Sequence, residues 1–163
     1  MPYQQVYPSI YASKSDAGPV GLLTRAVVKA LGARRILAID FQSQCSEFAK
    51  RYAATDIHLA TLKEGGKMVA YSKCHGKHTL EHFGFGERSE GIDCVIECSR
   101  AEVGAGPADN LIPMSIFVNK EVRLIGGLRY GLGCYALGVD HVEHGRINLT
   151  PLITHKFSSK DAS

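Results

Sequence analysis

Gly18-Pro-Val-Gly21 and the apolar run Arg35-Ile-Leu-Ala-Ile-Asp40 decide the expected fold, because Asp40 follows Gly21 by 19 positions. A glycine-rich turn that opens a helix places the helix N-terminus against a pyrophosphate, and an acid about 20 residues later binds the adenine-ribose hydroxyls. The spacing therefore predicts a dinucleotide site. An acid at Asp40 favours NAD over NADP, because its charge repels a 2′-phosphate.

Two features qualify this pattern. The full fingerprint is G-x-G-x-x-G, and Asp16 occupies its first glycine position. A carboxylate at that position would face the phosphates and repel them. Asp40 also has a structural alternative, since an acid at the end of a strand can cap a helix that opens near Ser43. The spacing favours ribose recognition over capping.

Composition limits the classes of protein that this chain can represent. It has 163 residues, 45% of them hydrophobic, and a net charge of +3, which suits one domain with a buried core. Its Lys and Arg residues are scattered among acids, so nucleic-acid binding is not expected. No apolar run reaches the roughly 18 residues of a membrane span, and the N-terminus lacks the features of a signal peptide. The five cysteines form no paired C-x-x-C units, which predicts reduced thiols in a cytoplasmic protein.

Hydrophobic spacing predicts alternating helices and strands. The expected elements are helices at 20–31, 44–53 and 135–143, an amphipathic surface helix at 68–83, and strands at 36–39, 57–59, 92–98, 122–125 and 155–157. The apolar runs at 36–39 and 92–98 are typical of strands that are buried on both faces. The alternation predicts an α/β fold with a parallel, Rossmann-type sheet and flanking helices.

Two cysteine-containing patterns hold residue types that can bind a metal. Cys74-His-Gly-Lys-His78 holds ligand residue types, but zinc usually takes about four ligands in two spaced pairs. Only one cluster is present and lysines flank it, so a solvated helix face is favoured. Cys94 and Cys98 lie four positions apart on an expected strand, where they share one face and are expected to be small core residues.

Six segments, in one order, resemble a known family. They are Gly18-Pro-Val-Gly-Leu-Leu23, Ala30-Leu-Gly-Ala-Arg-Arg-Ile36, Tyr52-Ala-Ala-Thr-Asp56, Cys98-Ser-Arg-Ala-Glu102, Leu128-Arg-Tyr-Gly131 and Pro151-Leu-Ile-Thr-His155. From about residue 17 onward, the chain resembles the cofactor domain of the zinc-dependent polyol dehydrogenases of the medium-chain dehydrogenase superfamily. Within that family it resembles the xylitol and sorbitol dehydrogenases most.

The resemblance implies a chemistry and a set of site residues. The family oxidises a secondary alcohol of an open-chain polyol to a ketose and passes hydride to NAD, with zinc as a Lewis acid. Gly18, Val20 and Gly21 would lie against the phosphates, and Asp40 would hold the ribose diol. The residues that would line the nicotinamide are Val103, Gly104, Ala105, Leu128 and Arg129. The residues that would reach the substrate hydroxyls are Arg129 and Tyr130.

The sequence also departs from the family. The zinc ligands of the family lie in an N-terminal catalytic domain that is not recognisable here, so no catalytic residue and no metal ligand is carried over. The apolar first strand is replaced by Ile10-Tyr-Ala-Ser-Lys-Ser15, and its loss would split the sheet in the middle. Cys45 and Arg100 stand where the family has an arginine and a glycine. Glu102 runs directly into Val103, where the family has a helix and the start of a strand.

The expected organisation is a divergent segment at 1–17 and a truncated NAD-binding Rossmann domain at 18–163, without a zinc domain. The expected function is that of the NAD-binding domain of a polyol dehydrogenase-like oxidoreductase that is inactive alone. A catalytically silent nucleotide-binding or oligomer-interface remnant is the alternative. The expected partners are NAD(H), a polyol substrate, and a second copy or an intact subunit; neither nucleic acid nor a membrane is expected.

Overall fold

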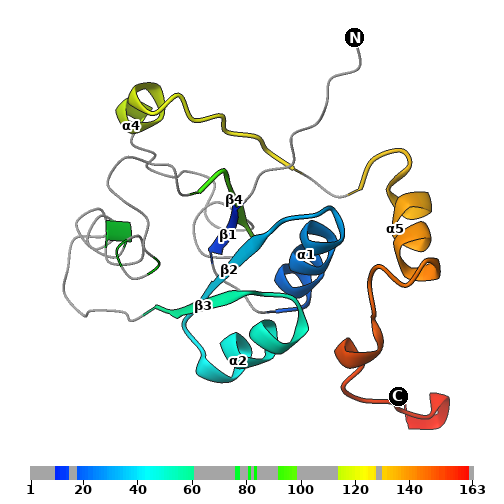
Figure 1. Ribbon diagram of the computed structural model, residues 1–163. Coiled ribbons are helices and arrows are strands. Elements are labelled where there is room, and N and C mark those ends of the chain that lie inside the picture. The colour runs from blue at the N-terminus through cyan, green and yellow to red at the C-terminus, as the bar shows by residue number, and fades with distance from the viewer. Residues whose placement is uncertain are drawn as a thin grey trace.

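A four-stranded parallel sheet organises the chain (Figure 1). The computed structural model describes residues 10–14, 18–60, 76–77, 81, 83, 92–98, 114–127 and 130–161. The strands are β1 (Ile10–Lys14), β2 (Arg35–Asp40), β3 (Asp56–Leu59) and β4 (Cys94–Glu97). Their order across the sheet is β3-β2-β1-β4. This arrangement confirms the predicted α/β fold with a parallel sheet.

Strand β1 is one of the two interior strands of this sheet, although the sequence pattern had argued against a strand there. Ile10 pairs with Arg35 of β2 at one end and Lys14 with Ile39 at the other, while residues 11–14 pair with β4. The prediction that the first strand is lost and the sheet split was therefore wrong. A ladder is built from backbone N–H and C=O groups, so a polar segment can form an interior strand when a neighbour on each side satisfies those groups.

Helix α1 (Pro19–Ala30) follows β1 and confirms the helix predicted at 20–31. Gly18 caps it in an extended conformation and Pro19 occupies the first turn, where the missing proline N–H costs no helical hydrogen bond. Gly32 follows the helix with φ +93°, a left-handed conformation that favours glycine at a helix C-terminus. Leu22 and Ala26 lie on the buried face of the helix.

Helix α2 (Ser43–Tyr52) confirms the helix predicted at 44–53. Figure 1 shows α1 and α2 beside β2 and β3. One buried cluster joins both helices to the sheet, with Phe48 and Tyr52 packed against it as expected; its buried members are Leu22, Ala38, Ala49 and Ala54. The apolar run of β2 is buried, as predicted for an interior parallel strand.

Strand β4 lies where a strand was predicted, but it is not buried on both faces. Val95 is 59% exposed, and the remaining positions of the strand are half-buried. The described sheet ends at β4, which pairs only with β1 in that sheet. A strand at the end of a sheet lacks a neighbour on one side, and an apolar run in the sequence does not reveal that position.

The C-terminal part contains helices α4 (Met114–Asn119) and α5 (Cys134–Glu143) and two short 3-10 helices, Thr150–Leu152 and Ser159–Asp161. The helix at 135–143 is thereby confirmed, whereas α4 was not expected. The strands predicted at 122–125 and 155–157 were wrong, because neither segment is a strand and both are exposed. An apolar extended segment becomes a strand only when a neighbouring strand pairs with it.

The amphipathic helix expected at 68–83 lies mostly outside the described residues, as do Cys74, His75 and His78. Two of its described residues, Lys77 and Glu81, are exposed and form an ion pair across 3.8 Å. An exposed pair at this spacing is typical of a solvated helix face. In the described part of the chain, every helix is too short or too polar to cross a membrane.

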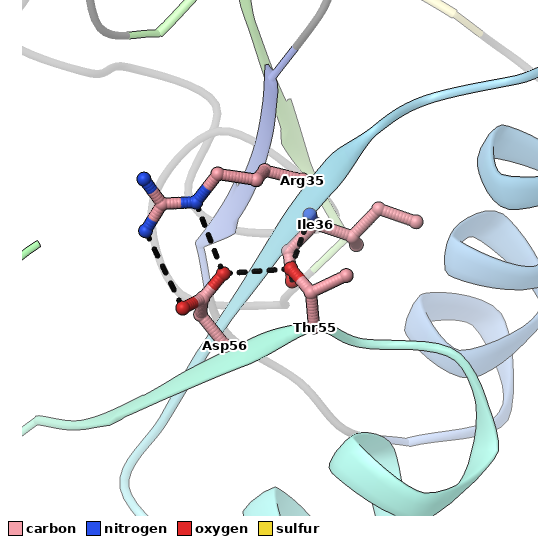
Figure 2. A network of polar contacts seen from close by, with 4 residues as sticks. All are labelled: Arg35, Ile36, Thr55 and Asp56. Carbon is pink, nitrogen blue, oxygen red and sulfur yellow. Dashed lines mark hydrogen bonds and ion pairs between the residues drawn. The ribbon is translucent and has the colours of Figure 1, made fainter.

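A polar network joins the start of β2 to the start of β3 (Figure 2). The Arg35 guanidinium donates from Nε and Nη2 to the two carboxylate oxygens of Asp56, each across 3.3 Å. The Thr55 hydroxyl donates to Asp56 across 2.7 Å and accepts from the Ile36 N–H across 2.8 Å. The network fixes the register of these two strands with charge-assisted hydrogen bonds.

Candidate functional site

The candidate site lies beyond the carboxyl ends of the parallel strands. We call this end of the sheet the dinucleotide edge. The chain passes from β1 to β2 to β3 on one side and then crosses to β4 on the other side of β1. The order therefore reverses between β1 and β4. In open parallel sheets, ligands bind beyond the carboxyl ends of the strands at such a reversal.

The first turn of α1 follows β1 at this edge. The Leu22 N–H donates to the Gly18 carbonyl across 3.0 Å, so the helix begins directly at the predicted glycine turn. Val20 is exposed and Gly21 is buried, and the first turn carries no acidic side chain. A helix N-terminus presents partial positive charge, so this turn suits an anion. Asp16, the residue that was expected to repel a phosphate, lies outside the described residues.

Thr24 connects this turn to the end of β4, a contact that sequence reasoning missed. Its hydroxyl donates to the Val20 carbonyl across 2.8 Å and lies 3.6 Å from the Cys98 thiol. Cys98 is half-buried, and it lies against α1 directly beyond the last residue of β4. The sequence spacing indicates the contact with Val20, because Thr24 lies one helical turn after Val20. The contact with Cys98 depends on the crossover to β4.

Asp40 ends β2 at the same edge and is only 6% exposed. Its Oδ1 accepts the N–H of Gln42, the N-cap residue of α2, across 2.7 Å. The structural alternative for Asp40 is thus present, because the carboxylate orients the backbone where α2 begins. A carboxylate accepts several hydrogen bonds, so this contact is compatible with a ribose diol as a further partner.

Cys45 occupies the position of the family's arginine and makes a local contact. Its thiol donates to the Gln42 side-chain oxygen across 3.3 Å. The position therefore supplies a neutral side chain in the first turn of α2. Cys45 therefore does not provide a positive charge that could support the adenosine end of a dinucleotide.

Tyr130, which the resemblance implied for the substrate hydroxyls, lies against α5. Its ring meets the Tyr135 ring edge to face, with centroids 4.8 Å apart. A hydrogen bond with Tyr130 raises the pKa of Tyr135. Both rings are largely exposed. The other residues implied for the nicotinamide end lie outside the described residues; they are Val103, Gly104, Ala105, Leu128 and Arg129.

A metal centre is not formed by the residues that the structure describes. Within them, no three His, Cys, Asp or Glu side chains lie close enough together to hold a metal ion. Cys94 and Cys98 both remain free thiols. Burial, followed by the charge of Asp93, raises the pKa of Cys94, which favours its neutral form and makes it a poor metal ligand.

Comparison with known sequences identifies relatives of this chain. A probable D-xylulose reductase A from Neosartorya fischeri is 35% identical, in an alignment that covers 90% of this chain and 43% of the relative. The D-xylulose reductase A of Aspergillus niger gives the same three values. The chain is a relative of the D-xylulose reductases. It spans less than half the length of these reductases, and the resemblance to polyol dehydrogenases is confirmed. No protein-family model matches the chain.

Solved structures confirm the Rossmann-type fold. The L-idonate 5-dehydrogenase of Escherichia coli K-12 superimposes with a TM-score of 0.64 at 22% identity, over 89% of this chain and 41% of its own. An Escherichia coli CFT073 protein described as a short chain alcohol dehydrogenase complexed with NADH gives a TM-score of 0.69 at 16% identity, over 95% and 46%. At these identities the likeness concerns the fold alone.

Proposed function

We propose that this chain is the NAD-binding domain of a polyol dehydrogenase-like oxidoreductase that interconverts a polyol and a ketose by hydride transfer. The observation that carries the proposal is the position of α1. Its N-terminus lies at the reversal of strand order, and Asp40 ends the neighbouring strand. The relationship to the D-xylulose reductases narrows the substrate class to open-chain polyols.

The described residues suit the adenosine half of NAD. The pyrophosphate would lie against the first turn of α1 at Gly18, Val20 and Gly21, and that turn itself carries no acidic side chain. Asp40 would accept hydrogen bonds from the ribose hydroxyls and would disfavour a 2′-phosphate by charge. When bound, NAD supplies the nicotinamide that exchanges hydride with the substrate carbon.

The nicotinamide half of the proposal follows the resemblance alone. Val103, Gly104, Ala105, Leu128 and Arg129 would line the ring, and Arg129 and Tyr130 would bind substrate hydroxyls. The NAD-binding unit comprises residues 18–163 in this proposal, with β1 completing its sheet. A cytoplasmic location suits a protein whose described cysteines are free.

Catalysis by the family also requires zinc, and the residues that the structure describes contribute no zinc site to the proposal. The 163-residue chain is therefore proposed to bind NAD without oxidising a polyol by itself. Incubation with xylitol, NAD and zinc is expected to yield no NADH. Zinc-dependent formation of NADH would contradict this part of the proposal.

Calorimetric titration with NADH, and with NADPH for comparison, tests the binding function. Saturable binding of NADH in preference to NADPH is expected. Asp40→Ala should weaken NADH binding about tenfold, because it removes charge-assisted hydrogen bonds to the ribose.

Asp93→Ala is the matched control, because Asp93 directly precedes β4 and so lies at the opposite edge of the sheet. It should leave the affinity for NADH unchanged. An equal loss of NADH affinity in the two variants would show that Asp40 has no specific role in the site. Absence of NADH binding by the folded wild-type chain would refute the proposal.

A silent interface remnant is the second candidate, and exposed apolar residues in the C-terminal part favour it. Val118, Ile125, Leu132 and Val139 are all exposed in the described chain, and such side chains recur at interfaces between proteins. Light scattering during size-exclusion chromatography distinguishes the candidates. A folded oligomer that binds neither cofactor would support the remnant, whereas a monomer that binds NADH would exclude it.

A further inference from the structure

A cavity lies away from the dinucleotide edge. It has a volume of about 500 Å³, is partly open to solvent, and is lined by residues from the C-terminal halves of α1 and α2 and from the segment 145–151. Both helices begin at the edge where the strands end, so their C-terminal halves lie toward the opposite edge. The volume falls within the roughly 300–1,000 Å³ of small-molecule pockets.

The cavity combines an apolar floor with fixed walls. Ala26, Ala53 and Ile147 form one buried cluster and line the floor. The Tyr52 hydroxyl donates to the Asn148 carbonyl across 2.8 Å, which ties the C-terminal wall to α2. The cavity is thus part of the packed contact between the helices and the segment after α5.

The charged residues that line the cavity all carry positive charge. They are Lys29, Arg51 and Arg146, and no acidic residue is among the described residues that line it. Like charges around one cavity repel one another, and a bound anion would relieve that repulsion. Arg146 is held near the rim by Asp140, with 3.4 Å between Nη1 and Oδ2, and a guanidinium has further donors to offer.

Helix dipoles provide a structural explanation for two of these cations. Lys29 and Arg51 lie in the last turns of α1 and α2, where positive charge is stabilising. Lys50 occupies the same last turn of α2 but does not line the cavity. A comparison of variants at Lys50 and Arg51 therefore distinguishes the effect of a charge at the helix end from the effect of a charge that lines the cavity.

We propose that this cavity binds a small organic phosphate. The apolar part of the ligand rests on the floor of Ala26, Ala53 and Ile147, and its phosphate accepts hydrogen bonds from Lys29, Arg51 and Arg146. A phosphate suits this rim better than a carboxylate, because it carries more charge and offers three acceptor oxygens to guanidinium groups. The site is separate from the proposed NAD site and does not depend on it.

Titration of the full chain with phenyl phosphate, followed by calorimetry, tests the proposal. Saturable binding is expected, and excess NADH should not displace the ligand. Inorganic phosphate should bind at least about tenfold more weakly, since it forgoes burial of the phenyl ring against the floor. Absence of saturable binding, displacement by NADH, or equal binding of inorganic phosphate would each overturn the proposal.

Charge-deleting variants locate the site. Arg51→Gln should weaken phenyl phosphate binding about tenfold, because a charge-assisted hydrogen bond is lost. Lys50→Gln removes the same charge from the same helical turn and should change the affinity by less than about twofold. Lys29→Gln, on the other helix, gives a second variant should Arg51→Gln fail to fold. An equal loss of affinity in a cavity variant and in Lys50→Gln would mean that only the overall charge of the chain matters. That result would overturn the proposed site.

Discussion

Residues 18–60 and residues 114–161 contain similar apolar side chains, yet they use them differently. Ile36 in the first region is 1% exposed, whereas Ile125 in the second is 77% exposed. In the first region, each helix returns the chain to a strand of the same sheet, so the inward apolar faces of α1, α2 and β2 meet in one buried cluster. Apolar content alone therefore does not bury a segment; burial requires a partner surface that the topology supplies.

The two regions nevertheless meet, and Leu152 of the second region packs against the buried cluster of the first. Ile147 is 6% exposed and packs against Ala26 of α1 and Ala53 at the end of α2. Tyr52 adds a hydrogen bond to the same contact. The comparison thus predicts large effects in the first region, intermediate effects at this contact, and small effects on the exposed surface of the second region.

The largest expected effect comes from the core of β2. Ile36→Ala should lower the free energy of unfolding by about 3 kcal/mol, because it leaves a cavity among packed side chains. Ile125→Ala removes the same atoms from an exposed position and should change it by less than about 0.5 kcal/mol. Urea unfolding followed by circular dichroism measures both. Similar losses in the two variants would break the comparison between the regions.

Ile147→Ala tests whether the second region is docked on the first. A loss of about 2 kcal/mol is expected, since Ile147 is buried against two small alanines. Ile153→Ala is the control, because Ile153 is 57% exposed and should cost less than about 0.5 kcal/mol. Chemical unfolding gives both values. An unchanged free energy of unfolding for Ile147→Ala would show that the contact between the two regions does not stabilise the fold.

Asp56→Asn probes the network that joins β2 to β3, and its effect depends on pH. Burial raises the pKa of Asp56, but hydrogen bonds from Thr55 and Arg35 outweigh it, so the pKa lies below its ordinary value of 3.8. A lowered pKa stabilises the fold above the ordinary value, and the stabilisation is lost as pH falls through the folded pKa.

The wild-type chain should therefore be more stable than Asp56→Asn by about 1 kcal/mol at neutral pH. The difference should shrink below pH 3.8, the ordinary value for this carboxyl. Urea unfolding at several pH values measures the difference. Glu143→Gln, which removes a carboxylate from an exposed position outside this network, is the control. A difference that stays constant into acid would contradict the charge-assisted network.

The smallest effect is expected from Tyr52→Phe, which removes the hydrogen bond to the Asn148 carbonyl. The bond spans 2.8 Å but is exposed to solvent, so its loss should cost about 0.5 kcal/mol. Thermal unfolding compared with Tyr135→Phe, whose ring is exposed on α5, measures the difference. A loss as large as that of Ile147→Ala would mean that the hydroxyl, and not apolar packing, holds the contact.

Local sequence patterns predicted the elements whose partners lie close in the chain. The glycine turn, α1, β2, α2 and β3 follow one another within residues 18–60, and spacing alone located them. Asp40 was likewise placed at the end of a strand beside the start of α2, because a strand and the following helix share one short connection. The roles of these residues in binding NAD remain predictions.

Patterns failed where a long-range neighbour decides the outcome. The polar residues Ser13 and Lys14 argued against a strand, yet both lie in β1 between two partner strands. The apolar run at 92–98 predicted a buried strand and the run at 122–125 a further strand, but pairing and burial depend on what lies beside each segment. Thr24 and Cys98 are 74 positions apart, so no local spacing could bring them together.

The sequence by itself determined the fold class, the glycine turn and the resemblance to a family, because helical and strand periodicity and short motifs are local properties of the chain. Only the tertiary structure decided that β1 is an interior strand, that β4 ends the described sheet, and that three cations converge on one cavity. Each of these facts depends on pairing or packing between segments distant in the sequence. The backbone groups and charges of one segment do not specify which distant segment will satisfy them.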